Sequence, residues 1–117
     1  YIDDAVDATI KLIDNPALAD PNFDKMNPNP STSFAPFRIF NIGNQESIPL
    51  MYFIELLEKE IGIKAIKNLK EFQPGDVQNT FASTDLLYNW TGYTPNTSIR
   101  IGIRNFINWY KSFYNLN

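Results

Sequence analysis

The sequence of 117 residues contains neither cysteine nor histidine. Without cysteine, the chain can form no disulfide and supply no thiolate, which fits the reducing environment of the cytoplasm. Without histidine, it lacks the side chain that most often serves as a general base and as a metal ligand. We therefore exclude nucleophilic catalysis by histidine or cysteine for this chain, and we expect no metal site in it.

The sequence also lacks a dinucleotide-binding loop and a lysine-activated tyrosine base. A dinucleotide site needs glycines close together, where the backbone approaches a pyrophosphate at a helix N-terminus. The five glycines are widely spaced, at Gly43, Gly62, Gly75, Gly92 and Gly102. None of the six tyrosines has a lysine four positions later. We expect these residues alone to bind no cofactor, to contain no catalytic residue and to be inactive.

Charge and hydropathy exclude two classes of partner. The net charge of −3 and the absence of any cluster of lysine or arginine argue against nucleic-acid binding. The apolar runs are too short to cross a bilayer, and no signal peptide is visible. We predict a cytoplasmic protein that binds neither nucleic acid nor membranes. The chain opens on Tyr1 directly before a helical pattern, which we interpret as a cut inside a larger domain.

Apolar residues recur at helical spacing in four segments. The expected helices begin at Asp3 or Asp4, near Pro49, at Ser83 or Thr84, and at Thr97 or Ser98. Asn15-Pro16, Gly62 and Gly92 are the expected ends of the first three. The apolar faces of these helices are Val6, Ile10 and Ile13; Leu50, Phe53, Ile54, Leu57 and Ile61; Leu86, Leu87 and Trp90, which we expect to point inward; and Ile99, Ile103, Phe106, Ile107, Tyr110 and Phe113.

The segments between the expected helices are predicted to form loops, a turn and one strand. Residues 15–36 are rich in proline and asparagine and have no periodicity, which predicts a long surface loop. Residues 37–43 favour β-structure and predict a strand that leaves a sheet. Residues 63–72 predict an extended segment, and the Pro-Gly pair of residues 73–76 predicts a turn. The pattern indicates an α/β fold with an α-rich lobe at the edge of a sheet.

The most interesting candidate site is the turn that contains Gln73 and Asp76, with Thr80 four residues further on. An aspartate carboxylate can accept two hydrogen bonds from a ribose diol, and a glutamine amide can donate to a phosphate oxygen or pair with a base edge. Taken alone, the residues favour an ordinary Pro-Gly-Asp turn without a ligand.

Three other polar positions have a functional and a structural interpretation. The neighbouring carboxylates of Asp3 and Asp4 could carry out acid–base chemistry, but at a helix start they favour capping and stabilisation of the helix dipole. Asn41 could contact a substrate, but a role in tying down the end of the expected strand is favoured. The aromatic residues of the last helix could stack on bases, but their helical spacing favours core packing: Trp109, Tyr110, Phe113 and Tyr114.

An ordered set of segments resembles the extended short-chain dehydrogenase/reductase superfamily, and within it the UDP-glucuronate 4-epimerases. The segments are Tyr1–Asp4, Ala35–Asn44, Gln73–Val77 and Gly92–Pro95, followed by Thr97, Gly102, Phe106, Trp109 and Tyr110. The resemblance covers essentially the whole chain. It implies that residues 1–117 are the C-terminal, α-rich, nucleotide-sugar-binding region of a Rossmann enzyme, with few strands and without the NAD-binding core.

The resemblance also implies an activity for the longer parent. The parent would be an isomerase that holds NAD and epimerises C4 of a UDP-hexuronic acid through a 4-keto intermediate, in polysaccharide biosynthesis and as a homodimer. Asp76 would bind ribose hydroxyls, Gln73 would stand where relatives place a phosphate-binding arginine, and Thr80 would lie near the same pocket. Gln73 is uncharged, so a diphosphate role there is weaker. Ser83 replaces the family's usual aspartate, and both residues cap helices.

Two alternatives remain open from the sequence. A related nucleotide-sugar dehydratase or decarboxylase would share most of these segments, although the Gln-Pro-Gly-Asp form and the proline-rich loop favour the epimerase. A non-catalytic interaction domain would account for the missing catalytic residues.

Overall fold

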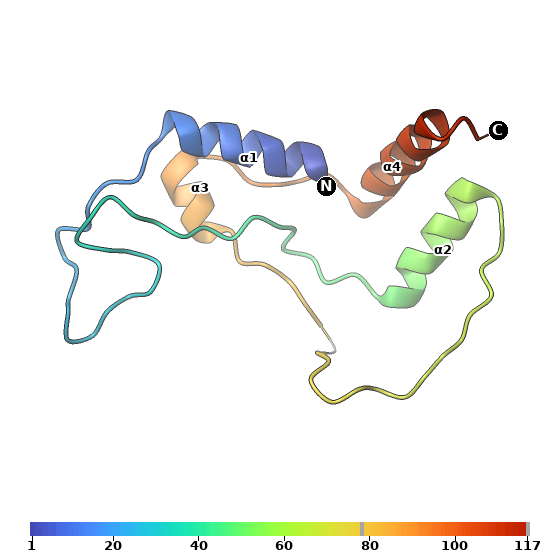
Figure 1. The fold of residues 1–117 in the computed structure, drawn as a ribbon, viewed down its shortest axis with the longest axis horizontal. Coiled ribbons are helices and arrows are strands. Elements are labelled where there is room, and N and C mark those ends of the chain that lie inside the picture. Colours follow the sequence, from blue (N-terminus) through green and yellow to red (C-terminus); the bar gives the residue numbers. More distant parts are fainter. Residues whose placement is uncertain (78, 117) are drawn as a thin grey trace. The chain divides into compact units, whose positions relative to one another are not determined.

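The computed structural model describes residues 1–77 and 79–116, and these contain four α-helices (Figure 1). They are α1 (Ile2–Asp14), α2 (Leu50–Ile61), α3 (Asp85–Thr91) and α4 (Ile99–Phe113). The chain divides into two compact units: Tyr1–Gln45 with Ala82–Asn96, and Glu46–Phe81 with Thr97–Asn117. The first unit therefore holds α1 and α3, and the second holds α2 and α4. The helix-rich lobe that the sequence predicts is confirmed.

Helix ends follow local signals in the sequence. Gly62 adopts a left-handed conformation, with φ of 85°, and its N–H donates to the carbonyl oxygen of Glu58 at the end of α2. Gly92 ends α3 in the same way, with φ of 70°. Glycine suits these positions because it has no Cβ to clash. At the start of α4, the Ser98 hydroxyl accepts a hydrogen bond from the N–H of Ile101, as expected of a cap.

The capping role expected of Asp3 and Asp4 is wrong, because α1 begins at Ile2, before either aspartate. Tyr1 is the N-cap, so both aspartates lie in the first turn of the helix. Carboxylates there still interact favourably with the helix dipole. Asp4 is buried and accepts a hydrogen bond from the hydroxyl of Tyr93, at 3.4 Å. Burial and the neighbouring carboxylates raise the pKa of Tyr93, so this pair has a structural role within the first unit.

The first unit is built on the packing of α1 against α3. Ala8 and Leu87 are completely buried in it. The apolar face expected of α1 is exposed instead, with 47%, 50% and 73% of Val6, Ile10 and Ile13 accessible. Within the described residues, this apolar face of α1 is therefore largely uncovered. Helical spacing shows which face is apolar, but only tertiary partners decide which face is covered.

The strand predicted at residues 37–43 is also wrong. Within the described residues, this part of the chain forms only an isolated antiparallel bridge between Arg38 and Thr32. A strand depends on a neighbouring backbone that accepts and donates a series of hydrogen bonds, and the pairing here does not extend beyond this bridge, where the N–H of Ile39 donates to the carbonyl oxygen of Ser31 at 3.0 Å. The preceding residues, 15–36, follow an irregular path in which the rings of Phe23 and Phe34 lie 5.9 Å apart.

The second unit has a small apolar core between α2 and α4. Leu56, Ile103 and Ile107 are buried together, and Tyr52, Leu57 and Ile99 pack against them. Leu50, which belongs to the expected apolar face of α2, is 69% exposed. The buried residues of α2 differ from those of its expected apolar face, because the surface that α4 covers decides which of them lie in the core.

The aromatic residues at the end of α4 lie on the surface. Trp109, Tyr110, Phe113 and Tyr114 are between 40% and 63% exposed. The core-packing interpretation of these residues is wrong for this structure. They contact one another instead: the rings of Trp109 and Phe113 stack with centroids 5.4 Å apart, and those of Tyr110 and Tyr114 lie 4.7 Å apart.

Candidate functional site

The predicted turn at residues 73–76 is confirmed, and it lies in the second unit. The N–H of Asp76 donates to the carbonyl oxygen of Gln73 at 3.1 Å. The N–H of Gln73 lies 3.4 Å from a carboxylate oxygen of Asp76. Gly75 has a φ of 96°, a conformation that side-chain-bearing residues rarely adopt. The Pro-Gly pair therefore brings Gln73 and Asp76 together, as the sequence predicts.

The side chains of this turn are available to a ligand. Gln73, Asp76 and Thr80 are all exposed. One carboxylate oxygen of Asp76 contacts the backbone, which leaves acceptor capacity for hydroxyl groups. Among the described residues, no hydrogen bond joins Thr80 to Gln73 or Asp76. The structure therefore assembles two of the three expected site residues, and the common site of all three stays a prediction.

A second polar feature of this unit is a buried carboxylate that the sequence analysis missed. Glu58 lies on α2, and only 4% of its side chain is exposed. It accepts hydrogen bonds from the ammonium group of Lys64 at 2.8 Å, from the N–H of Ala65 at 3.0 Å, and from the ammonium group of Lys67. We call Glu58, Lys64, Ala65 and Lys67 the Glu58 cluster. A carboxylate on the apolar face of a helix, four residues after Ile54 and three before Ile61, was the signal that could have revealed it.

The charges of the Glu58 cluster lower the pKa of Glu58 and raise the pKa of Lys64. The two lysine ammonium groups and the N–H of Ala65 stabilise the ionised carboxylate, and they lower the pKa of Glu58 from 4.5 to about 2. The carboxylate in turn raises the pKa of Lys64. Glu58 is therefore a permanent anion near neutral pH, suited to holding cations and not to exchanging protons.

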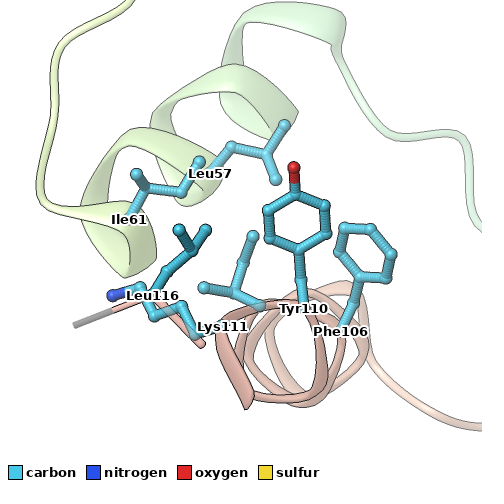
Figure 2. A pocket seen from close by; sticks show the side chains of 7 residues that line it. Leu57, Ile61, Phe106, Tyr110, Lys111 and Leu116 are labelled. Carbon is cyan, nitrogen blue, oxygen red and sulfur yellow. The ribbon is translucent and has the colours of Figure 1, made fainter. Parts of the chain in front are cut away.

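Apolar hollows also lie among the described residues of the second unit. One, of about 280 Å³, lies between α2 and α4 (Figure 2). It is lined by Leu57, Ile61, Phe106, Ile107, Tyr110, Lys111 and Leu116. Another, of about 520 Å³, lies between α2 and residues 63–69. Neither is lined by a residue of the turn, so these hollows are separate from the expected nucleotide site.

The polar contact of Asn41 favours its structural interpretation. Its side-chain N–H lies 3.4 Å from the carbonyl oxygen of Ser83, just before α3. Next to it, the side-chain N–H of Gln45 donates to the buried hydroxyl of Thr84 at 2.8 Å. These two amides fasten residues 41–45 to the start of α3 within the first unit.

The described part of the chain contains no group of three or more acidic, histidine or cysteine side chains that could hold a metal ion. No helix in the described ranges has the length and apolar character that crossing a membrane requires.

Comparison with known proteins gives the chain its relatives. No family model matches the chain. It is 45% identical over 114 residues to an uncharacterized 37.6 kDa protein in the cld 5′ region of Escherichia coli O111:H-, and 38% identical over 114 residues to the protein CapI of Staphylococcus aureus. It is 38% identical over 118 residues to a probable UDP-glucuronate 4-epimerase of Rhizobium meliloti (strain 1021). Each match covers 97% of this chain and 34% of the relative.

The chain is therefore a relative of nucleotide-sugar epimerases and spans about 34% of the length of these curated relatives. Within that class, its relatives include a probable UDP-glucuronate 4-epimerase of Rhizobium meliloti and UDP-glucuronate 4-epimerase 1 of Arabidopsis thaliana. The resemblance drawn from the ordered segments of the sequence is confirmed by this similarity.

Proposed function

We propose that this chain is the UDP-sugar-binding region of an NAD-dependent nucleotide-sugar epimerase, an isomerase that interconverts UDP-glucuronate and UDP-galacturonate. The observation that carries the proposal is the similarity of 97% of this chain to a probable UDP-glucuronate 4-epimerase. The chain would form the C-terminal, α-rich lobe of an extended short-chain dehydrogenase/reductase. The full-length protein would be a cytoplasmic homodimer that serves polysaccharide biosynthesis.

The exposed turn is the part of the chain whose chemistry suits the substrate. We assign ribose hydroxyls to the carboxylate of Asp76, because an ionised carboxylate is a strong acceptor for a diol. We assign the diphosphate to the amide of Gln73, and Thr80 to the edge of the same pocket. Gln73 carries no charge, so its contribution to diphosphate binding is smaller than that of an arginine.

The residues of this chain do not fit an NAD site. Its five glycines lie at least ten positions apart, so no Gly-rich loop can cradle a pyrophosphate. The chemistry at C4 of the sugar therefore belongs to other parts of the full-length protein. The exposed apolar face of α1 fits a region of a longer protein, because the rest of that protein has further surface with which to cover this face.

The experiment that tests the proposal is product analysis of the full-length protein with UDP-glucuronate. Formation of UDP-galacturonate, with no loss of carbon dioxide, supports the 4-epimerase. Release of carbon dioxide would assign the protein to the decarboxylases of the same superfamily, and loss of water would assign it to the dehydratases. Unchanged UDP-glucuronate together with no binding of UDP would favour a non-catalytic interaction domain.

A further inference from the structure

The Glu58 cluster connects the end of α2 to the chain that leads into the turn. Three groups that follow Gly62 converge on the one carboxylate: the ammonium groups of Lys64 and Lys67 and the N–H of Ala65. The carboxylate is buried, and a buried charge is stable only while its partners remain in place. While α2 keeps Glu58 buried, the carboxylate therefore favours the conformation of the segment in which Lys64, Ala65 and Lys67 contact it.

Apolar burial does not hold this segment. Residues 64–73 form neither helix nor strand. Ile63, Ile66 and Leu69 are 71%, 101% and 77% exposed. Within the described residues, the contacts to Glu58 are the polar contacts that fix the path of the chain between Gly62 and the turn.

The distance along the chain makes this anchor relevant to the turn. Lys67 precedes Gln73 by six residues, whereas Gly62 precedes it by eleven. An extended chain spans at most about 3.5 Å per residue, so the turn can reach about 20 Å from an anchor at Lys67 and nearly 40 Å from one at Gly62. Releasing Glu58 would enlarge the space open to the turn by roughly three- to sixfold.

We propose that Glu58 is a positioning residue for nucleotide-sugar binding, which acts by anchoring residues 64–67 and so restricting where Gln73 and Asp76 can lie. The inference rests on the proposed function of the turn. It concerns substrate binding only: Glu58 is buried on α2 and is not expected to touch the substrate.

The test compares Glu58→Gln with Glu60→Gln in the full-length protein. Glu60 is a matched control because it lies on the same helix and pairs with Arg104 of α4, at 3.6 Å, instead of with the segment. The measurements are KM and kcat for UDP-glucuronate, and the rate of trypsin cleavage after Lys64 and Lys70. We expect Glu58→Gln to raise KM by roughly three- to sixfold, as the enlarged space predicts, to leave kcat within about twofold, and to speed cleavage. We expect Glu60→Gln to change none of these.

Two results would overturn the inference in distinguishable ways. If Glu58→Gln speeds cleavage but leaves KM unchanged, while Asp76→Asn raises KM, the anchor exists without positioning the turn, and the proposed function stands. If Asp76→Asn also leaves KM unchanged, the turn is not the nucleotide site. The positioning role of Glu58 then falls together with the assignment of the ribose to Asp76, whereas turnover of UDP-glucuronate still supports the epimerase.

A second pair of variants covers the case in which Glu58→Gln does not fold. Lys67→Arg keeps the charge and the hydrogen bond, whereas Lys67→Gln removes the charge and leaves Lys64 in place. We expect Lys67→Gln to raise KM and Lys67→Arg to have the same KM as the wild type. An equal KM for these two folded variants would contradict the anchoring role.

Discussion

The indole N–H of Trp90 donates a hydrogen bond of 2.8 Å to the carbonyl oxygen of Asn15, 75 residues earlier in the chain. The contact joins α3 to the end of α1 within the first unit. The guanidinium of Arg38 lies 5.0 Å above the same indole ring, and the ring of Phe40 is 6.1 Å away. One side chain thus connects both helices with the segment that follows the long loop.

The first prediction concerns this indole. Trp90→Phe removes the hydrogen bond to Asn15 and weakens the contact with Arg38, so we expect the free energy of unfolding of the full-length protein to fall by about 1–2 kcal/mol. Urea denaturation followed by circular dichroism measures this change. Trp109→Phe is the control, because Trp109 is 56% exposed, and we expect it to cost less than about 0.5 kcal/mol. Equal losses in the two variants would contradict the role of Trp90.

The second prediction concerns the close approach of Gly43 to Ala82. A Cβ added at Gly43 would lie 2.9 Å from the Cβ of Ala82, which is too short for two carbon atoms. Gly43→Ala should therefore destabilise the protein by about 1–3 kcal/mol through overpacking. Ala82→Gly in the same chain should recover part of this loss. A double-mutant cycle of unfolding free energies checks it, and a coupling energy near zero would show that the two residues do not meet.

The third prediction is a pH dependence that arises from Glu58. Its pKa is lowered from 4.5 to about 2 in the folded protein, so its contribution to stability is present above pH 4.5 and is lost as the pH falls towards 2. Glu58→Gln cannot titrate. The difference in melting temperature between the wild type and Glu58→Gln should therefore be constant from pH 5 to 7 and should shrink below pH 4.5. A difference that stays constant down to pH 2.5 would show that the ionised carboxylate adds nothing to stability.

The fourth prediction concerns the turn. Asp76→Asn keeps the shape of the side chain but removes its charge, so we expect UDP to bind roughly tenfold more weakly, since a hydrogen bond to a charged group contributes about 1.5–3 kcal/mol. Isothermal titration of the full-length protein with UDP measures this affinity. Glu71→Gln is the control, because Glu71 is exposed and lies just before the turn. If both variants bind UDP like the wild type, the ribose does not contact Asp76.

Local signals allowed the helices and the turn to be predicted. The spacing of apolar residues located the four helices, Ser98 and Gly62 marked two of their ends, and the Pro-Gly pair marked the turn. Each of these features depends on residues within a few positions of one another, and therefore the sequence alone contains the information.

Features that depend on distant parts of the chain were not predictable in the same way. A strand at residues 37–43 needs a paired neighbour, and the burial of Ile13 or Trp109 needs a partner surface. The cluster around Glu58 combines a helix residue with a segment that forms neither helix nor strand. The sequence marks Glu58 as a carboxylate on the apolar face of the helix, but it does not identify the lysines that pair with it. Within the candidate site, the turn joins Gln73 to Asp76, whereas the position of Thr80 relative to them depends on the path of the chain after the turn.

The division into two units separates the two tryptophans of the chain. Trp90 belongs to the unit that contains Ala82–Asn96, and Trp109 to the unit that contains Thr97–Asn117. Trp109 is more than half exposed, whereas Trp90 is partly shielded by Arg38 and Phe40. Each unit thus carries its own intrinsic fluorophore, and the single-tryptophan versions of this chain would report by emission on one unit at a time.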